Sequence, residues 1–247
     1  MTDKEQRWTE IEHLPEWDEE FYHIYTAKKF GKWVMIKTLK PEYADDPRFQ
    51  HMIEQEFDVR YSLAHPNIIM INDFEDIPGI GRCIVTDDVY GDSLRKLIDK
   101  RQVMPAHIEQ LRHQLVNALD YIETKHIVHP ALKPENIIFT ENIGNLKLID
   151  VGFDQRNSLS HADTNDDIEA YGRLMQEVLR RTGRRDPRMA RIADRAAAGG
   201  YRDVQELELA IGGRRSRGFA IVAAFVILAL AAVLAWLLYN PNALPQS

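Results

Sequence analysis

The chain has a single cysteine, Cys83, among its 247 residues. One cysteine excludes an internal disulfide and a cysteine-based zinc site, and it suits a reducing compartment. The chain also lacks an excess of positive charge, because its 31 lysines and arginines are outnumbered by 38 aspartates and glutamates, which gives a net charge of −7. Arg214, Arg215 and Arg217 are the only charges after residue 213, so the first 213 residues carry −10. This acidity argues against nucleic-acid binding.

Internal repeats, low-complexity tracts and Ser/Gly-rich linkers are absent from residues 1–212. We therefore treat this region as one domain, which at about 210 residues is large enough to bury a core without disulfides or metals.

One long apolar run is present, Gly218–Tyr239, and it contains no charged residue. As a helix its 22 residues rise about 33 Å, enough to cross a hydrocarbon core of about 30 Å. We expect a transmembrane helix, with a buried core helix as the alternative. The basic segment 213–217 precedes it and no lysine or arginine follows, so the positive-inside rule predicts a cytoplasmic N-terminal domain and a tail, 240–247, on the far side. Alanines at four-residue spacing, such as Ala220 and Ala224, are a weak signal for dimerisation through the helix.

Hydrophobic periodicity gives a coarse order of elements for residues 1–212. Phe30-Gly31 separates two strands of a predicted hairpin, and Pro105 begins an amphipathic helix with apolar residues every three or four positions. The expected strands are Phe21–Lys28, Lys32–Thr38, Ile68–Phe74, Arg82–Thr86, Asn136–Phe139 and Leu146–Ile149, and the expected helices are Asp46–Leu63, a helix from Pro105 to Ile122, and mostly helix from Asp167. This order predicts an α+β domain with a small strand-rich lobe, about 1–88, and a shortened helical lobe, about 89–212.

Several motifs in this order resemble those of the protein kinase family. HPALKPENIIF, at His129–Phe139, is similar to the catalytic loop HRDLKPEN, and LIDVGF, at Leu148–Phe153, is similar to the DFG segment. WVMIK, ending at Lys37, resembles VAIK, and IVTDDVYGDSL, at Ile84–Leu94, resembles the hinge between the lobes. The resemblance runs from about Phe21 to Ile211 and implies a two-lobed kinase fold of the Ser/Thr type.

The resemblance also implies a nucleotide site. Lys37 stands at the position of the phosphate-binding lysine and Glu56 at that of its helix partner, so we expect their charged atoms to lie within about 4 Å. Asn136 and Asp150 stand at the two positions that hold Mg²⁺. The hinge residues that would border a bound nucleotide are Thr86, Asp87 and Val89.

Four departures from the family pattern oppose catalysis. Ala131 replaces the aspartate that orients the substrate hydroxyl, although Lys133 is retained, so we expect no catalytic residue. WDEEFY, at Trp17–Tyr22, replaces the glycine-rich loop with large and acidic side chains. Met35 replaces the small alanine over the adenine. DIEAYGRLMQEVL, at Asp167–Leu179, resembles the central helix of the kinase large lobe and begins only 17 positions after Asp150, which leaves too little chain for a substrate-binding loop.

The leading hypothesis is therefore a membrane-anchored pseudokinase that acts as an interaction or scaffold module for a protein partner, in signalling or in a membrane complex. The alternatives are a divergent ATP-dependent Ser/Thr kinase, which would use Lys37, Glu56, Asn136, Asp150 and Lys133, and a nucleotide sensor without phosphotransfer. ATP with Mg²⁺ is disfavoured as a cofactor because the glycines of the phosphate loop are missing.

Overall fold

The structure, a computed structural model, describes residues 7–128, 132–141, 145–151, 154–156, 159–183 and 185–212. Ala131 and the predicted segments 213–217, 218–239 and 240–247 lie outside the described residues. The chain divides into two units, Met1–Glu208 and Leu209–Ser247, and the description below concerns the first. Within the described residues, we find no helix with the length and apolar character needed to span a bilayer.

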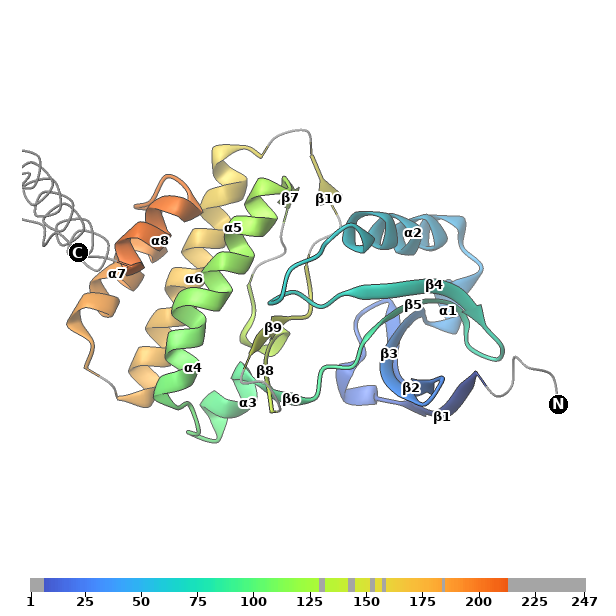
Figure 1. Ribbon diagram of the computed structural model, residues 1–247. Coiled ribbons are helices and arrows are strands. Elements are labelled where there is room, and N and C mark those ends of the chain that lie inside the picture. Colours follow the sequence, from blue (N-terminus) through green and yellow to red (C-terminus); the bar gives the residue numbers. More distant parts are fainter. Residues whose placement is uncertain are drawn as a thin grey trace, which may run out of the picture. The chain divides into compact units, whose positions relative to one another are not determined.

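A five-stranded antiparallel sheet forms the small lobe, in the order β1-β2-β3-β5-β4 (Figure 1). Its strands are β1 (Trp8–His13), β2 (Tyr22–Lys29), β3 (Lys32–Leu39), β4 (Ile71–Ile77) and β5 (Gly81–Asp87). The predicted hairpin is confirmed: β2 pairs with β3 across Phe30 and Gly31, whose φ angles of 51° and 80° are both positive, as a tight two-residue hairpin turn requires.

Strand β1 was not predicted, and β4 begins at Ile71 rather than at Ile68. Most residues of β1 are exposed, so the strand lacks the apolar alternation by which sequence reasoning finds strands. Its pairing with β2 also shifts register between Thr9 and Glu12, where Glu10 has a φ of 53°. Such a bulge at the edge of a sheet discourages pairing with another chain.

Helix α2 (Pro47–Tyr61) lies beside the sheet and is the predicted helix (Figure 1). The Asp46 side chain caps its N-terminus by accepting a hydrogen bond from the Arg48 amide. Its three buried residues are Ile53, Glu56 and Arg60, two of which are charged. Buried charges such as those of Glu56 and Arg60 each need an ionic or hydrogen-bonding partner. These partners are residues in and around the cleft described below.

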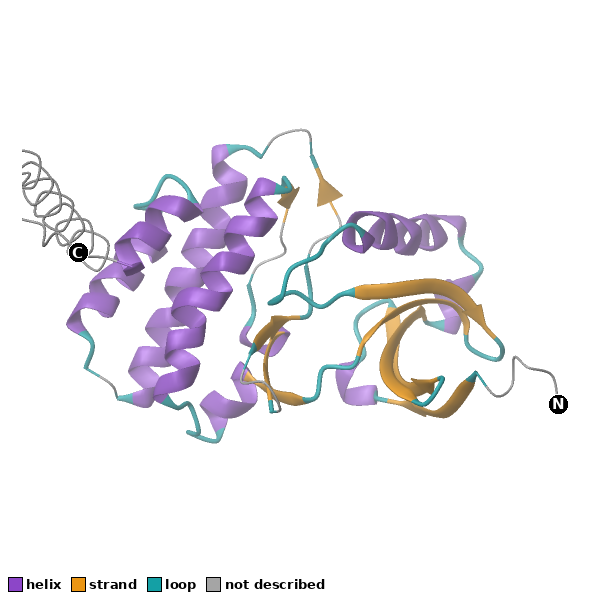
Figure 2. Ribbon diagram, in the orientation of Figure 1, coloured by secondary structure: helices purple, strands orange, loops and turns teal. Residues whose placement is uncertain are grey.

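Long helices dominate the second lobe (Figure 2). The predicted helix after Pro105 is present as α4 (Pro105–Gln110), a π-helical turn (Leu111–Leu115) and α5 (Val116–Thr124). The other helices of this lobe are α3 (Leu94–Asp99), α6 (His161–Thr182), α7 (Pro187–Ala197) and α8 (Val204–Gly212), with a 3₁₀ turn at Pro134–Asn136. The small lobe also contains the short helix α1 (Pro41–Ala44) and a 3₁₀ turn at Pro15–Trp17. The short strands are β6 (Gly91–Ser93), β7 (Ile127–Val128), β8 (Ile137–Thr140), β9 (Leu146–Leu148) and β10 (Asp154–Gln155).

Helices α6 and α7 pack at very short range. A Cβ atom added at Gly172 of α6 would lie 2.2 Å from the backbone nitrogen of Ala197 and 2.8 Å from the carbonyl oxygen of Ala193, both on α7. Glycine is therefore required at this position for the two helices to approach.

Candidate functional site

A cleft of about 570 Å³ lies between the sheet of the small lobe and a large-lobe surface formed by β6, the start of α3, and the residues directly before β8 and directly after β9. Four of the predicted nucleotide-site residues line it: Lys37, Thr86, Asn136 and Asp150. The volume is within the usual range for small-molecule sites, roughly 300–1,000 Å³. Space alone does not exclude a nucleotide, so the chemistry of the lining decides what this cleft can bind.

The predicted ion pair between Lys37 and Glu56 is present. Strand β3 brings Lys37 to the cleft and α2 brings Glu56, and the distance from Lys37 Nζ to Glu56 Oε1 is 3.0 Å. The Lys37 ammonium also lies 4.1 Å from the centre of the Tyr22 ring, at cation–π distance. Only 11% of the Lys37 side chain and 2% of the Glu56 side chain are exposed, so solvent screens this pair weakly.

Arg60 adds a second cation to the pair. It lies four residues after Glu56 on α2, and its Nη1 contacts the same carboxylate oxygen that Lys37 contacts. Its Nη2 donates a hydrogen bond to the carbonyl oxygen of Ile149, at 3.1 Å, directly before Asp150. Active kinases place a large apolar group at this position of the helix. The structure shows that Arg60 instead joins α2 to the chain segment that carries Asp150.

The charges of this network set one another's protonation. Burial alone would raise the pKa of Glu56, but Lys37 and Arg60 outweigh it and hold the pKa below its ordinary value. Burial would lower the pKa of Lys37, but the carboxylates of Glu56 and Glu19 raise it above the ordinary range. Both groups are therefore ionised at neutral pH.

The connection between β1 and β2 enters the cleft where the family has its glycine-rich loop. Glu19 accepts a hydrogen bond from Lys37, with 2.8 Å between Oε2 and Nζ. Trp17 packs against a buried apolar cluster of Ile69, Val89 and Ile138. The sequence predicted that these side chains oppose phosphate binding, but it did not predict that Glu19 pairs with Lys37 or that Trp17 packs on this apolar cluster.

The two predicted metal ligands are neighbours. Asn136 Nδ2 donates to Asp150 Oδ2 at 3.1 Å, and the backbone supports the pair, because the amide of Ile149 donates to the carbonyl of Asn136 at 3.0 Å. Carboxylate and amide oxygens fit Mg²⁺, which completes its octahedral shell with water and phosphate oxygens. The amide nitrogen of Asn136 faces Asp150, so metal binding requires rotation of this side chain to present its oxygen.

The hinge residues differ in what they offer a ligand. The Thr86 hydroxyl faces the cleft and donates to the carbonyl of Asp87 at 3.1 Å, while Val89 is buried in the apolar cluster beneath Trp17. The Asp87 carboxylate accepts a hydrogen bond from Asn72, at 2.9 Å on the exposed side, and is not part of the cleft lining. Lys133 is exposed and is also outside the lining.

Acidic residues outnumber basic ones around the cleft. The acidic lining residues are Glu16, Asp18, Glu19, Glu135 and Asp150, and the basic ones are Lys37, Arg60 and Lys96. Arg60 is already paired with Glu56, and Lys96 pairs with Asp92. Two of the acidic residues are engaged as well, Asp18 by His13 and His23 and Glu135 by Arg95. A nucleoside triphosphate would therefore have Lys37 as its principal cation, and Lys37 is itself engaged by two carboxylates.

Comparison with known proteins agrees with this geometry. The model of the protein kinase domain matches residues 21–177. The probable serine/threonine-protein kinase SCO3848 of Streptomyces coelicolor is 33% identical over 138 residues, which cover 54% of this chain and 20% of that protein. Serine/threonine-protein kinase PrkC of Bacillus subtilis is 33% identical over 133 residues, 53% of this chain and 20% of that protein. The chain thus spans only about a fifth of the length of these two relatives.

A solved structure has the same fold. The crystal structure of the Mycobacterium tuberculosis PknI kinase domain superposes with a TM-score of 0.59 at 20% identity, over 83% of this chain and 95% of that domain. The two-lobed α+β architecture and the position of the cleft between the lobes are those of protein kinases. With the kinase model matching more than half of its residues, the chain belongs to the protein kinase domain family.

Proposed function

We propose that this protein is a membrane-anchored pseudokinase whose kinase-like domain serves as a scaffold for a protein partner. The observation that carries the proposal is the chemistry of the loop between β1 and β2, which lines the cleft with Trp17, Asp18 and Glu19 where the family has glycines. Trp17 packs on the apolar cluster beside the cleft, and Glu19 accepts a hydrogen bond from Lys37, the residue at the position of the phosphate-binding lysine. The loop thus presents large and acidic side chains to a nucleotide, and these oppose phosphate binding.

Departures in the sequence support the same proposal. Ala131 cannot accept a proton from a substrate hydroxyl, a role typically worth about 10²- to 10⁴-fold in rate. Met35 lines the cleft in place of a small residue, and the 17-residue interval from Asp150 to Asp167 leaves little chain for a substrate platform. What the domain retains is the fold of the family, on which a scaffold can present a surface to a partner.

Membrane attachment rests on the sequence of Gly218–Tyr239. We propose one spanning helix, residues 1–212 in the cytoplasm and the tail 240–247 on the far side, because the arginines of 213–217 lie on one flank only. The small residues of the helix make dimerisation through it a secondary proposal.

A nucleotide sensor or a divergent kinase is the second candidate, favoured by the pairing of Asn136 with Asp150 at 3.1 Å and of Lys37 with Glu56 at 3.0 Å. These pairs place a lysine and two metal-ligand side chains in one cleft. Bound Mg²⁺ would neutralise phosphate charge there. For a phosphate to pair with Lys37, Glu19 must leave its present contact with that lysine.

Nucleotide-dependent stability of the full chain distinguishes these candidates. A ligand at 100 times its Kd adds about 2.7 kcal/mol to the free energy of unfolding. We expect millimolar ATP with Mg²⁺ to add much less than this, and ATP with EDTA to add nothing. A full-sized increase that Asp150→Ala abolishes would overturn the scaffold proposal in favour of the sensor or the enzyme.

A further inference from the structure

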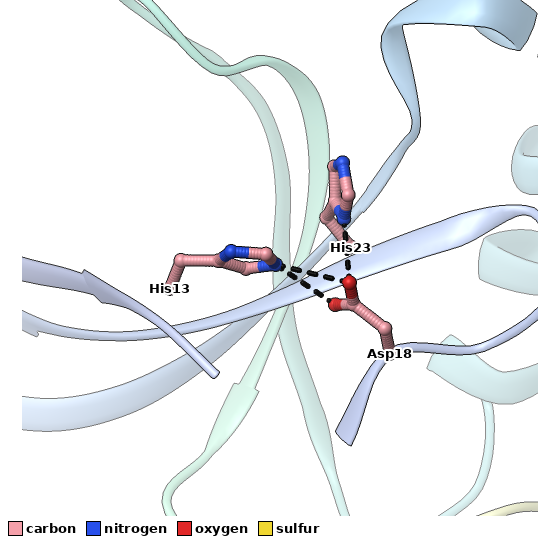
Figure 3. A group of neighbouring side chains, drawn as sticks. All are labelled: His13, Asp18 and His23. Carbon is pink, nitrogen blue, oxygen red and sulfur yellow. Dashed lines mark hydrogen bonds and ion pairs between the residues drawn. The ribbon is translucent and has the colours of Figure 1, made fainter. Parts of the chain in front are cut away.

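Two histidines and an aspartate converge at the base of the loop between β1 and β2 (Figure 3). His13 ends β1, His23 lies near the start of β2, and Asp18 lies between them in the loop. His13 Nε2 lies 3.0 Å and 3.1 Å from the two Asp18 oxygens, and His23 Nδ1 lies 2.8 Å from Asp18 Oδ2. The backbone amide of Ile24 donates to Asp18 Oδ1 at 3.0 Å and fixes the carboxylate in place.

The three side chains are close enough to share one ion. One donor atom from each lies within 4.8 Å of the other two, and within the described ranges of the chain no other group of three His, Cys, Asp or Glu side chains comes this close. Zinc bonds of about 2.0–2.2 Å place tetrahedral donor atoms roughly 3.3 Å apart. The observed separations of 2.8–3.1 Å between imidazole nitrogens and carboxylate oxygens would therefore need to widen by only a few tenths of an ångström.

We propose that His13, Asp18 and His23 form a binding site for a divalent transition metal of the zinc class. The two imidazole nitrogens are borderline donors, and with one carboxylate they favour such ions over Mg²⁺ or Ca²⁺, which prefer oxygen ligands alone. Side chains of these three residues are 36%, 19% and 24% exposed, so an ion can enter from solvent and retain water in its open positions. The site is separate from the predicted magnesium ligands, Asn136 and Asp150.

Metal binding here would act on the cleft through the chain itself. Asp18 stands between Trp17, which packs on the apolar cluster, and Glu19, which pairs with Lys37, and all three line the cleft. An ion that ties Asp18 to both flanking strands removes the freedom that these residues need to withdraw. The metal site stands independently of whether nucleotide binds, whereas its effect on the cleft rests on the proposed function.

Cobalt and zinc titrations of the full chain test the site. The chelator-treated protein is titrated with Co²⁺, whose visible d–d absorption reports nitrogen and oxygen ligation, and the Co²⁺ is then displaced with Zn²⁺. We expect one equivalent to bind. His13→Gln and His23→Gln retain an amide that can donate a hydrogen bond to Asp18 but lack the imidazole, and each should weaken Zn²⁺ binding at least tenfold.

His51→Ala is the matched control, because His51 is exposed on α2 and lies outside the cluster. It should leave the affinity and the spectrum unchanged. The proposal is overturned if the wild-type chain binds no Co²⁺ or Zn²⁺ at 100-micromolar concentrations, or if His13→Gln and His23→Gln bind as tightly as His51→Ala. The metal titrations contain no nucleotide, so their result tests the metal site alone. The scaffold proposal is tested separately, by the effect of ATP with Mg²⁺ on stability.

Discussion

Replacing Glu56 by glutamine removes the one anion that both buried cations of the cleft share. Lys37 and Arg60 each contact Glu56 Oε1, and their side chains are 11% and 5% exposed. Removing one partner of a buried ion pair costs about 3–5 kcal/mol when the remaining charge is left without compensation. Arg60 loses the carboxylate that it contacts, whereas Lys37 keeps its contact with the 44% exposed Glu19. In a domain of this size 1 kcal/mol lowers the melting temperature by about 2–4 °C, so Glu56→Gln should lower it by roughly 6–20 °C.

The cost of Glu56→Gln should depend on pH. The pKa of Glu56 in the folded protein lies below its ordinary value of 4.5, since Lys37 and Arg60 outweigh the effect of burial. An acid whose pKa is lowered by folding contributes its full stability above the unfolded pKa and loses it as the pH falls through the folded pKa. The difference in unfolding free energy between the wild type and Glu56→Gln should be constant near neutrality and shrink below about pH 4.5.

Urea and thermal unfolding of the full chain at several pH values measure this difference. Glu54→Gln is the control, because Glu54 lies on the same helix, carries the same charge and pairs with Arg82, yet 45% of its side chain is exposed. An exposed pair contributes about 1 kcal/mol or less. If Glu56→Gln proves no more costly than Glu54→Gln, or if its cost does not change in acid, the network does not stabilise the fold and our account of it is wrong.

Three other changes give separate tests. Glu19→Gln should raise the affinity for MgATP by up to about fivefold, because the ion pair of the 44% exposed Glu19 with Lys37 contributes no more than about 1 kcal/mol. Calorimetry measures both affinities, and the control Glu20→Gln should leave the affinity for MgATP unchanged. Gly172→Ala should cost about 1–3 kcal/mol in urea unfolding, because its Cβ would lie 2.2 Å from the Ala197 nitrogen, and an unchanged midpoint would contradict the close helix packing. Truncation after Gly213 should release the domain from membranes, and retention at high salt would show that something other than Gly218–Tyr239 holds it there.

Sequence reasoning located the elements whose side chains alternate or repeat clearly. The hairpin of β2 and β3 follows from β-branched and aromatic residues around Phe30-Gly31, and the helix after Pro105 from its apolar period. It missed β1, because Trp8–His13 joins the sheet by backbone pairing with little burial of its side chains. Such backbone pairing cannot be predicted from the local pattern of apolar and polar residues.

The candidate site was predicted only as far as the family resemblance reached. Lys37, Glu56, Asn136 and Asp150 come together as the motifs imply. The ionic role of Arg60 and the contacts of Trp17 and Glu19 were not predicted, because they depend on how a divergent loop and helix pack in three dimensions. A signal was available in retrospect: acidic residues beside a tryptophan, in place of glycines, put both an anion and an apolar ring at the mouth of the cleft.

The bond from Arg60 to the Ile149 carbonyl has a consequence for communication. In catalytic kinases the position of the helix that carries the lysine's glutamate partner is adjustable, and regulation acts by moving it. In this protein Arg60 contacts the Glu56 carboxylate on the same helix and the carbonyl oxygen of Ile149, directly before Asp150. These two contacts favour a single arrangement of α2. A partner that recognises the outer face of α2 would thus meet the same surface at all times. Such a complex would then signal by the binding or release of the partner, and not by a conformational change of this chain.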